Sequence, residues 1–347
     1  MHLARIVLDR MRADEMGPAP TLAFSCDVDP GWHRQRKGTG FSYTAPDGSR
    51  PDASELARIK ALAIPPAWTD VWICRDACGH IQATGRDEKG RKQYRYHAEW
   101  TEQRSATKFE TLPAFAAALP GLREQVQRDL RRRTLGYERV VASVVWLLDN
   151  SLIRIGNPAY ARDNKSFGLT TLRRRHVEIT GHKLQFQFKG KSGKEWRLQM
   201  ADRRIANILK SLQELPGQHL FKYEDEGHYC SISSRDVNDY LAAFAGPDFT
   251  AKHFRTWAGT VRAFGLFADA ELPETKTAQA RAMNALIDQV AAKLGNTRTV
   301  CRQSYIHPAI PRSWQDGELR RSGRLKAVDG MDEDEVETVA FLKRQTH

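Results

Sequence analysis

Five side chains along this 347-residue chain could together break a phosphodiester bond. Without a metal, that reaction needs a nucleophile, fixed positive charge on the non-bridging phosphate oxygens, and an acid for the departing oxygen. Arginine suits the second task because it stays charged and presents a fork of donors. A lysine near arginines loses its proton more readily than usual, so it can act as the acid. The candidates are, in chain order, Arg154, Lys191, Arg255, Asn296 and Tyr305.

Two of these candidates follow clear local patterns. Residues 140–148 are apolar enough to form a buried helix, and Arg154 comes shortly after it. Residues 183–188 and 195–199 alternate in polarity on either side of a Gly- and Lys-rich segment, which predicts a β-hairpin with Lys191 at its tip. A lysine at such a tip is usually a solvated turn residue, so the pattern alone assigns it no role.

The other three candidates lie around helices predicted in the last third of the chain. Arg255 is near the start of an amphipathic helix, and Asn296 follows Gly295, which is placed as a helix C-terminal cap. Tyr305 lies in a short helix that Pro308 stops. A single arginine or tyrosine at such a position is ordinarily structural or solvated. The inference therefore depends on the combination and its order.

The N-terminal third of the chain has the pattern of strands. Residues 71–74, 80–84 and 91–97 are separated by turns containing glycine, which predicts a β-meander. Tyr94 and Tyr96 share one face of the last strand, and the pattern alone favours packing of that face on a core. From about residue 105 onward the pattern is helical.

Charge and hydrophobicity restrict the class of protein. The formal net charge is +12, which favours encounter with polyanions, although a protein that merely carries many Lys and Arg explains it equally well. No apolar run approaches the roughly 20 residues that span a bilayer. Residues 1–16 mix charges through their apolar positions and so lack the core of a signal peptide. We expect an intracellular protein.

The five cysteines indicate neither disulfides nor a strong metal site. Their number is odd and their spacing irregular, which argues against a disulfide framework. Cys74, Cys78 and His80 resemble part of a zinc motif, but no second ligand pair follows at the required spacing. The residues between them are typical of a turn. We expect no metal.

From about Gly31 to Pro308 the sequence resembles the type IB DNA topoisomerases of the compact bacterial and poxvirus kind. That family carries an arginine in R-[IFT]-G, a lysine in a G-K hairpin, an arginine in K-x-x-R-T, a His or Asn, and a Tyr. Asn296 stands where some members have histidine, and it can still donate a hydrogen bond to a phosphate oxygen. The residues that match these motifs are Arg154, Lys191, Arg255, Asn296 and Tyr305.

The resemblance also implies DNA contacts outside the catalytic set. The stretch from Asp87 to His97 is similar to the family's most recognisable N-terminal motif, which favours DNA contact over core packing for its two tyrosines. Aromatic and amide side chains on a strand can enter the major groove while basic ones bind phosphates. The implied contacts are Arg91, Lys92, Gln93, Tyr94, Tyr96, Tyr160 and Lys252.

What the resemblance implies is a complete reaction. Tyr305 would form a 3′-phosphotyrosyl link, two arginines and Asn296 would stabilise the pentacoordinate phosphorus, and Lys191 would protonate the leaving oxygen. The cut strand would swivel and be resealed without ATP, metal or other cofactor. Consistently, the sequence contains no G-x-x-x-x-G-K-[ST] loop.

The implied fold is α+β with two domains. Residues 1–104 would form a small β-rich DNA-binding domain, and residues 105–347 a larger, mainly α catalytic domain with a β-hairpin, together making a clamp around duplex DNA. We expect a cytoplasmic, nucleoid-associated monomer whose partner is double-stranded DNA, with no membrane contact. An acidic segment, 331–336, begins what we expect to be a terminal helix, either packed or solvated, and no function is assigned to it.

Two rival interpretations share part of this pattern. A tyrosine recombinase uses the same catalytic logic but usually carries H-x-x-R, whereas Lys252 occupies that position here and His253 is out of register with Arg255. Recombinases also lack the R-K-Q-Y motif. A non-catalytic DNA-binding module would explain the basic charge and the aromatic strand. All five catalytic positions carry competent residues, which favours the enzyme.

Overall fold

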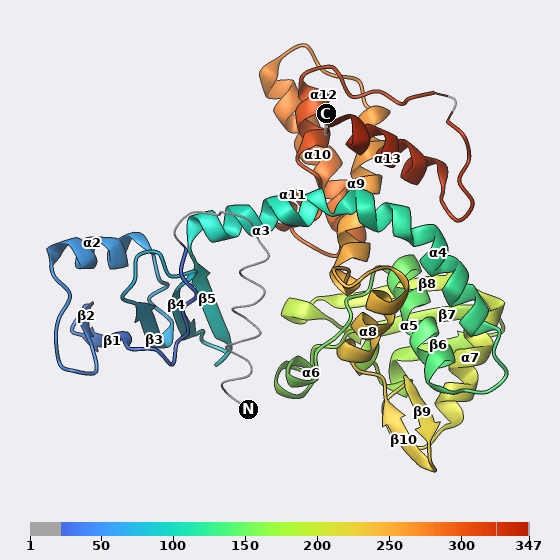
Figure 1. The fold of residues 1–347 in the computed structure, drawn as a ribbon, viewed down its shortest axis with the longest axis horizontal. Coiled ribbons are helices and arrows are strands. Elements are labelled where there is room, and N and C mark those ends of the chain that lie inside the picture. Colours follow the sequence, from blue (N-terminus) through green and yellow to red (C-terminus); the bar gives the residue numbers. More distant parts are fainter. Residues whose placement is uncertain (1–21, 324, 346–347) are drawn as a thin grey trace. The chain divides into compact units, whose positions relative to one another are not determined.

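The computed structural model describes residues 22–323 and 325–345 of the chain. The expectation for residues 1–16 therefore lies outside the described residues. The chain divides into two compact units, Met1–Thr107 and Lys108–His347, each with its own hydrophobic core (Figure 1). None of the helices in the described ranges combines the length and apolarity that a bilayer span requires.

The first unit is built on a five-stranded antiparallel sheet with the strand order β2-β1-β3-β4-β5. Trp32 and Ile73 are buried on the face of the sheet that also buries Ile59 of helix α2. The predicted β-meander is confirmed as the last three strands. The elements are β1 (Gly31–Lys37), β2 (Gly40–Thr44), α2 (Ala53–Ala61), β3 (Thr69–Cys74), β4 (Ile81–Arg86) and β5 (Lys92–Tyr96).

Helices form most of the second unit. Helix α3 crosses the boundary between the units, because its last turn, from Lys108, belongs to the second one. The helices are α3 (Ala98–Glu110), α4 (Leu112–Leu130), α5 (Tyr137–Ser151), α6 (Pro158–Asn164), α7 (Arg203–Glu214), α8 (Ser234–Phe244), α9 (Ala251–Ala268), α10 (Lys276–Leu294), α11 (Arg298–Ser304), α12 (Ala309–Gln315) and α13 (Glu333–Gln345).

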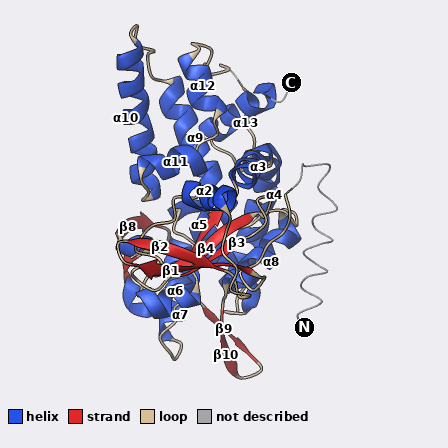
Figure 2. Cartoon of the chain, turned by 90° about the vertical axis from the view of Figure 1, so that its left-hand side faces the viewer, coloured by secondary structure: helices blue, strands red, loops and turns tan. Residues whose placement is uncertain are grey.

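The second unit also contains two small antiparallel sheets, drawn in red in Figure 2. The larger has the order β6-β7-β8 and includes the hairpin predicted from the sequence. Its strand β7 buries Leu184, Phe186 and Phe188, the alternate residues expected of a strand with one covered face. The strands are β6 (Val177–Thr180), β7 (Lys183–Lys189), β8 (Glu195–Ala201), β9 (Lys222–Asp225) and β10 (His228–Ser231).

Helix α9 is the centre of the second unit. It packs against α4, α5 and α8 and also against α10, α12 and α13 (Figure 2). Phe254 and Ala263 lie on opposite sides of this helix and both are buried, as is Phe267, which shows that α9 is covered on more than one face. Arg255, near the start of this helix, is buried with it, so its guanidinium requires polar partners from neighbouring segments.

One expectation about the C-terminal third needs correction, and another is confirmed. The short helix before Pro308, α11, ends at Ser304, so Tyr305 is its C-terminal cap rather than a helical residue. The acidic segment does form a helix, α13, but Glu335 and Glu337 in it are buried at 6% and 2% exposure. Burial of carboxylates requires partners: Glu337 accepts from Ser322 N at 2.7 Å, and Glu335 accepts from Arg123.

Candidate active site

Arg255 lies near the start of α9 and is only 3% exposed. Its guanidinium donates hydrogen bonds to the main-chain carbonyls of Leu152 and Leu294, the latter at 2.6 Å. Leu152 is the left-handed cap that follows α5, and Leu294 is the last residue of α10. Helix C-terminal carbonyls lack partners within the helix and carry partial negative charge. Two helix ends therefore fix this buried cation.

Arg154 contacts Asn296 directly, although 142 residues separate them in the sequence. Arg154 Nη2 donates to Asn296 Oδ1 at 2.5 Å. The main chain at Arg154 is fixed in turn, because its carbonyl accepts from Leu169 N at 2.9 Å. A Cβ on Gly168 would lie 2.4 Å from that same carbonyl, so only glycine fits there.

Tyr305 is positioned by its main chain. Its amide donates to Cys301 O at 2.9 Å, and its carbonyl accepts from Thr260 Oγ1 at 3.2 Å. Gly259 lets α9 approach closely, since a Cβ there would lie 2.6 Å from the Tyr305 carbonyl. The Arg255 guanidinium lies 5.1 Å from the centroid of the Tyr305 ring.

The electrostatic environment of Tyr305 favours its ionised form. Burial raises the pKa of the phenol, but the positive charges of Arg255, Arg154 and Lys191 outweigh burial and lower the pKa below its ordinary value. The pKa of Arg255 is also lowered, first by burial and then by repulsion from Arg154. The structure thus brings Arg154, Arg255, Asn296 and Tyr305 into one cluster.

Lys191 is the sequence candidate that the structure leaves outside that cluster. It is exposed in a single 3-10 turn at the tip of the β7–β8 hairpin. Its charge contributes to the lowered pKa of Tyr305, so it lies within electrostatic range of the phenol. A group that catalyses proton transfer need not contact the other catalytic residues before the ligand binds.

Trp196, which the sequence did not single out, lies between this hairpin and the loop of Asn296. A Cβ on Gly190 would lie 2.7 Å from its indole, and one on Gly295 would lie 2.8 Å from it. Gly295 also has φ +61°, the left-handed region that favours glycine. The base of the Lys191 hairpin is thus packed on the turn that carries Asn296.

The cluster has donors without acceptors. Within the described residues, the partners of Arg154 and Arg255 are uncharged oxygens, and two buried donors, Arg255 Nε and Asn296 Nδ2, have no hydrogen-bond partner. The amide lies near the Cys301 thiol without good hydrogen-bond geometry. Unsatisfied buried donors are costly, and an oxyanion would satisfy them. Chemically the cluster can bind a phosphate and present a tyrosine to it.

Three candidate DNA-contacting residues in the first unit form hydrogen bonds or ion pairs with two aspartates. Asp87 accepts from Arg91 Nε at 2.8 Å and from Gln93 Nε2 at 3.0 Å. Hydrogen bonding by Arg91 is the main reason that the pKa of Asp87 falls to about 2. Lys92 forms an ion pair with Asp27. These polar side chains are thereby ordered along β5, a strand at the edge of its sheet.

The aromatic candidates are exposed rather than buried. Tyr94 and Tyr96 are 43% and 47% exposed, and their rings stack at 5.8 Å, which contradicts packing of this face on a core. In the second unit, Tyr160 on α6 is 41% exposed. Lys252 is exposed in the first turn of α9, one turn before Arg255. Exposed aromatic rings and amines are available to a nucleic-acid ligand.

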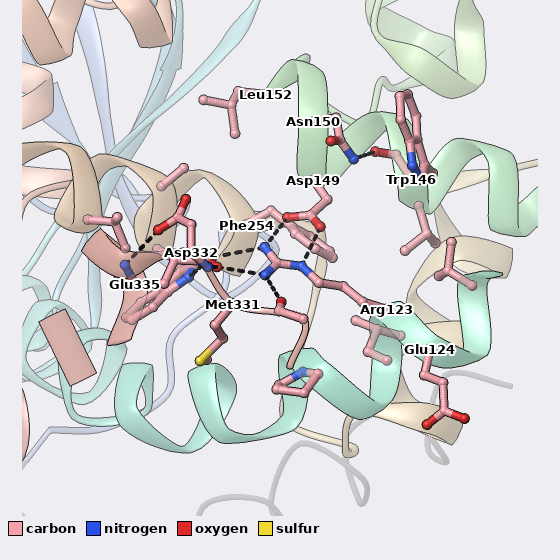
Figure 3. A pocket seen from close by; sticks show the side chains of 18 of the residues that line it. Arg123, Glu124, Trp146, Asp149, Asn150, Leu152, Phe254, Met331, Asp332 and Glu335 are labelled. Atoms are coloured by element: carbon pink, nitrogen blue, oxygen red, sulfur yellow. Dashed lines mark hydrogen bonds and ion pairs between the residues drawn. The ribbon is translucent and has the colours of Figure 1, made fainter. Parts of the chain in front are cut away.

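A second charged cluster, also missed from the sequence, lies on the same helices (Figure 3). Arg123 of α4 donates to both carboxylate oxygens of Asp149, at 2.7 and 3.0 Å, and to both of Glu335, at 2.7 and 2.9 Å. It also donates to Gly330 O at 2.5 Å. Glu335 in turn accepts from Trp257 Nε1 at 2.8 Å. This cluster explains the buried carboxylate of α13.

Comparison with known families gives two matches that together cover most of the chain. Residues 97–317 match the catalytic core of eukaryotic DNA topoisomerase I. Residues 40–87 match the N-terminal domain of bacterial DNA topoisomerase IB.

Individual relatives agree with these matches. The chain is 33% identical over 290 residues to DNA topoisomerase 1B of Acanthamoeba polyphaga mimivirus, an alignment that covers 80% of this chain and 85% of the viral protein. It is 20% identical over 260 residues to DNA topoisomerase 1B of vaccinia virus, covering 73% and 79%. It is 26% identical over 183 residues to DNA topoisomerase 1 of Mycosarcoma maydis, covering 47% of this chain and 18% of that protein.

Proposed function

The chain belongs to the type IB DNA topoisomerase family, and we propose that the cluster around Tyr305 is the site at which it cuts one DNA strand. The protein is a type I DNA topoisomerase that relaxes supercoiled DNA. The observation that carries the assignment of the site is the meeting of Tyr305 with two arginines and with two buried, unpaired donors.

Each residue of the cluster has a role that its geometry supports. Tyr305 Oη attacks the phosphorus as its proton passes to solvent water, and the lowered phenol pKa favours that loss. Arg154, Arg255 and Asn296 stabilise the negative charge that grows on the non-bridging oxygens. The free donors Arg255 Nε and Asn296 Nδ2 are available for those oxygens. Binding the transition state more tightly than the ground state is what lowers the barrier.

The covalent step conserves a phosphoester bond. The bond from Tyr305 Oη to phosphorus forms as the bond from phosphorus to O5′ breaks, which leaves a 3′-phosphotyrosyl ester and a 5′-hydroxyl. Lys191 gives the proton to the departing oxygen, and it reaches that position when the exposed hairpin tip moves toward bound DNA. Religation is the reverse reaction, and no nucleotide is consumed because the ester retains the bond energy.

We further propose how the remainder of the chain takes part. Residues 1–104 bind DNA through the β5 face, residues 105–347 carry out catalysis, and the two close as a clamp on duplex DNA. The stacked, exposed Tyr94 and Tyr96 and the net charge of +12 support this role. We also propose that the protein is a monomer and that it works in the cytoplasm on the nucleoid.

Relaxation of a supercoiled plasmid in EDTA without ATP tests the proposed site. We expect the parent protein to relax the plasmid and Tyr305→Phe to lose relaxation completely, because phenylalanine has no nucleophilic oxygen. Tyr229→Phe, at an exposed tyrosine on the β10 strand, is the matched control and should relax normally. Denaturation with detergent during the reaction should trap a protein–DNA adduct only where Tyr305 is intact. Relaxation by Tyr305→Phe would refute the assignment.

A further inference from the structure

The last turn of α3 contacts the chain on both sides of Tyr305. Lys108 Nζ donates a hydrogen bond to Ser304 O at 2.5 Å. The neighbouring Phe109, buried at 6% exposure, packs edge-on against the ring of His307 with centroids 5.3 Å apart. Ser304 directly precedes Tyr305 and His307 follows it by two residues. Two consecutive side chains of α3 therefore fix the segment that carries the tyrosine.

The Ser304 carbonyl requires a donor from outside its own helix. Helix α11 ends at Ser304, and the last carbonyls of a helix have no partner within it. A lysine ammonium is well suited to this position, because it donates hydrogen bonds and is attracted to the negative end of the helix dipole. Lys108 thus caps α11 from another helix and fixes the peptide that joins Ser304 to Tyr305.

The surroundings of Lys108 show that its charge is not balanced by a carboxylate in the described residues. Its ammonium lies 4.3 Å from the centroid of the Phe109 ring. Burial and then repulsion from Lys252 lower the pKa of Lys108 to about 8. The ammonium form still dominates at pH 7. A partly buried, repelled lysine lowers stability unless its hydrogen bond compensates, which indicates that the contact with Ser304 is an important one.

The same short segment also contacts the helix that carries Arg255. Thr111, which precedes α4, lies 3.5 Å through its Oγ1 from His253 Nε2 in the first turn of α9. His253 Nδ1 accepts from Thr250 N at 3.0 Å, which fixes the ring at the start of α9. Residues 108–111 therefore touch both the end of α11 and the start of α9.

We propose that Lys108 is a positioning residue that sets the location of Tyr305 for attack on the phosphate. Lys108 is the first residue of the second unit, and the residues before it in α3 belong to the first. Because one helix is continuous through the boundary, a rotation of its last turn moves Lys108 Nζ, which is the donor to Ser304 O. The nucleophile is thereby coupled to the helix that leaves the DNA-binding unit. This inference rests on the proposed role of Tyr305 as nucleophile.

The test is single-turnover cleavage of a duplex that loses a short strand fragment when cut, so that religation does not obscure the rate. Lys108→Met retains the length and apolar stem of lysine but removes the donor, and Lys108→Arg restores a charged donor. Lys210→Met, at an exposed lysine on α7, is the matched control. DNA affinity is measured separately for every variant on an uncleaved duplex in the Tyr305→Phe background.

We expect Lys108→Met to cleave about 10- to 100-fold more slowly, the loss associated with a hydrogen bond to a charged group. Its DNA affinity should stay within about 3-fold of the parent, because the residue acts through Tyr305 rather than on DNA. Lys108→Arg should recover most of the rate, and Lys210→Met should match the parent. If Lys108→Met melts below the assay temperature, the cleavage rates of Lys108→Gln and Lys108→Arg are compared instead. Both variants keep a hydrogen-bond donor, and only arginine keeps the charge.

Two results would overturn the proposal. One is cleavage by Lys108→Met at the parental rate. The other is a loss confined to DNA affinity with an unchanged rate at saturation. A parent protein that relaxes DNA but forms no adduct through Tyr305 would instead refute the proposed function, so the two failures are distinguishable.

Discussion

Two charged clusters both include contacts to α5 and α9, and their arginines are satisfied in opposite ways. Arg123 uses all five of its N–H donors, four of them on the carboxylates of Asp149 and Glu335. Those carboxylates outweigh burial and raise the pKa of Arg123, whereas burial and Arg154 lower the pKa of Arg255. Arg255 has no carboxylate partner in the described residues and keeps Nε unpaired.

The difference separates a structural network from a site prepared for a ligand. A fully satisfied arginine that joins four segments has no capacity left for another acceptor, so its role is to connect α4, α5, α9 and the C-terminal segment (Figure 3). The other cluster maintains unpaired donors and excess positive charge, which reduces stability until an anion binds. Its positions are nevertheless rigid, because main-chain carbonyls fix them. Rigid but unsatisfied groups are the arrangement that electrostatic catalysis requires.

Substitution in the unsatisfied cluster should affect catalysis far more than stability, and Arg255→Lys should show the largest effect. Lysine retains the charge but cannot reach two helix ends and the phosphate with one ammonium. We expect single-turnover cleavage to fall about 10²- to 10³-fold. Arg262→Lys, at an exposed arginine of the same helix, is the control. A loss below about 5-fold would contradict the role assigned to the guanidinium.

Substitution in the Arg123 cluster should affect stability far more than catalysis. Arg123→Met leaves Asp149 and Glu335 without their shared cation, and we expect a loss of about 2–3 kcal/mol in the free energy of unfolding, below the range for fully buried pairs because Arg123 is partly exposed. Urea denaturation measures this loss. Arg128→Met, at an exposed position on α4, is the control. The cleavage rate of the folded variant should change less than that of Arg255→Lys, and a larger change would remove the contrast between the clusters.

Asn296 offers a finer test, because its side-chain oxygen accepts a hydrogen bond and its side-chain nitrogen has no partner. Oδ1 accepts from Arg154, whereas Nδ2 is buried without a partner. We expect Asn296→Ala to slow cleavage about 10-fold through loss of one donor to the phosphate. Asn296→His should recover part of the rate, because a ring N–H replaces the amide donor. Equal rates for the parent and Asn296→Ala would show that the free nitrogen has no catalytic use.

The smallest expected effect concerns pH. Burial raises the pKa of Glu335, but Arg123 outweighs it and the pKa is lowered. A carboxyl group whose pKa is lower in the folded state contributes stability above its unfolded pKa, about 4.3, and loses it as pH falls through the folded value. The difference in unfolding free energy between the parent and Glu335→Gln should therefore shrink as the pH falls below about 4. A difference that stays constant would show that Glu335 is not stabilised as a carboxylate.

Much of the local structure could be predicted from the sequence. The β-meander, the β7–β8 hairpin and the Gly295 cap all follow from residue periods and turn residues within short windows, and the structure confirms them. The end of α11 was placed too late, because Tyr305 closes the helix with φ −133° before Pro308 is reached. Its closing contact comes from Thr260 of α9, which no local pattern could show.

The sequence by itself determined which residues can do chemistry and the elements that carry them. Only the tertiary structure decided which are brought together, and what supports them. Arg255 and Leu152 are 103 residues apart, Lys108 and Ser304 are 196 apart, and Arg123 and Glu335 are 212 apart. The physical reason is that periodicity reports the face of one helix or strand, whereas hydrogen bonds between distant segments depend on how those faces pack. The burial of Glu335 in α13 therefore depends on its contact with Arg123, which the local sequence pattern does not show.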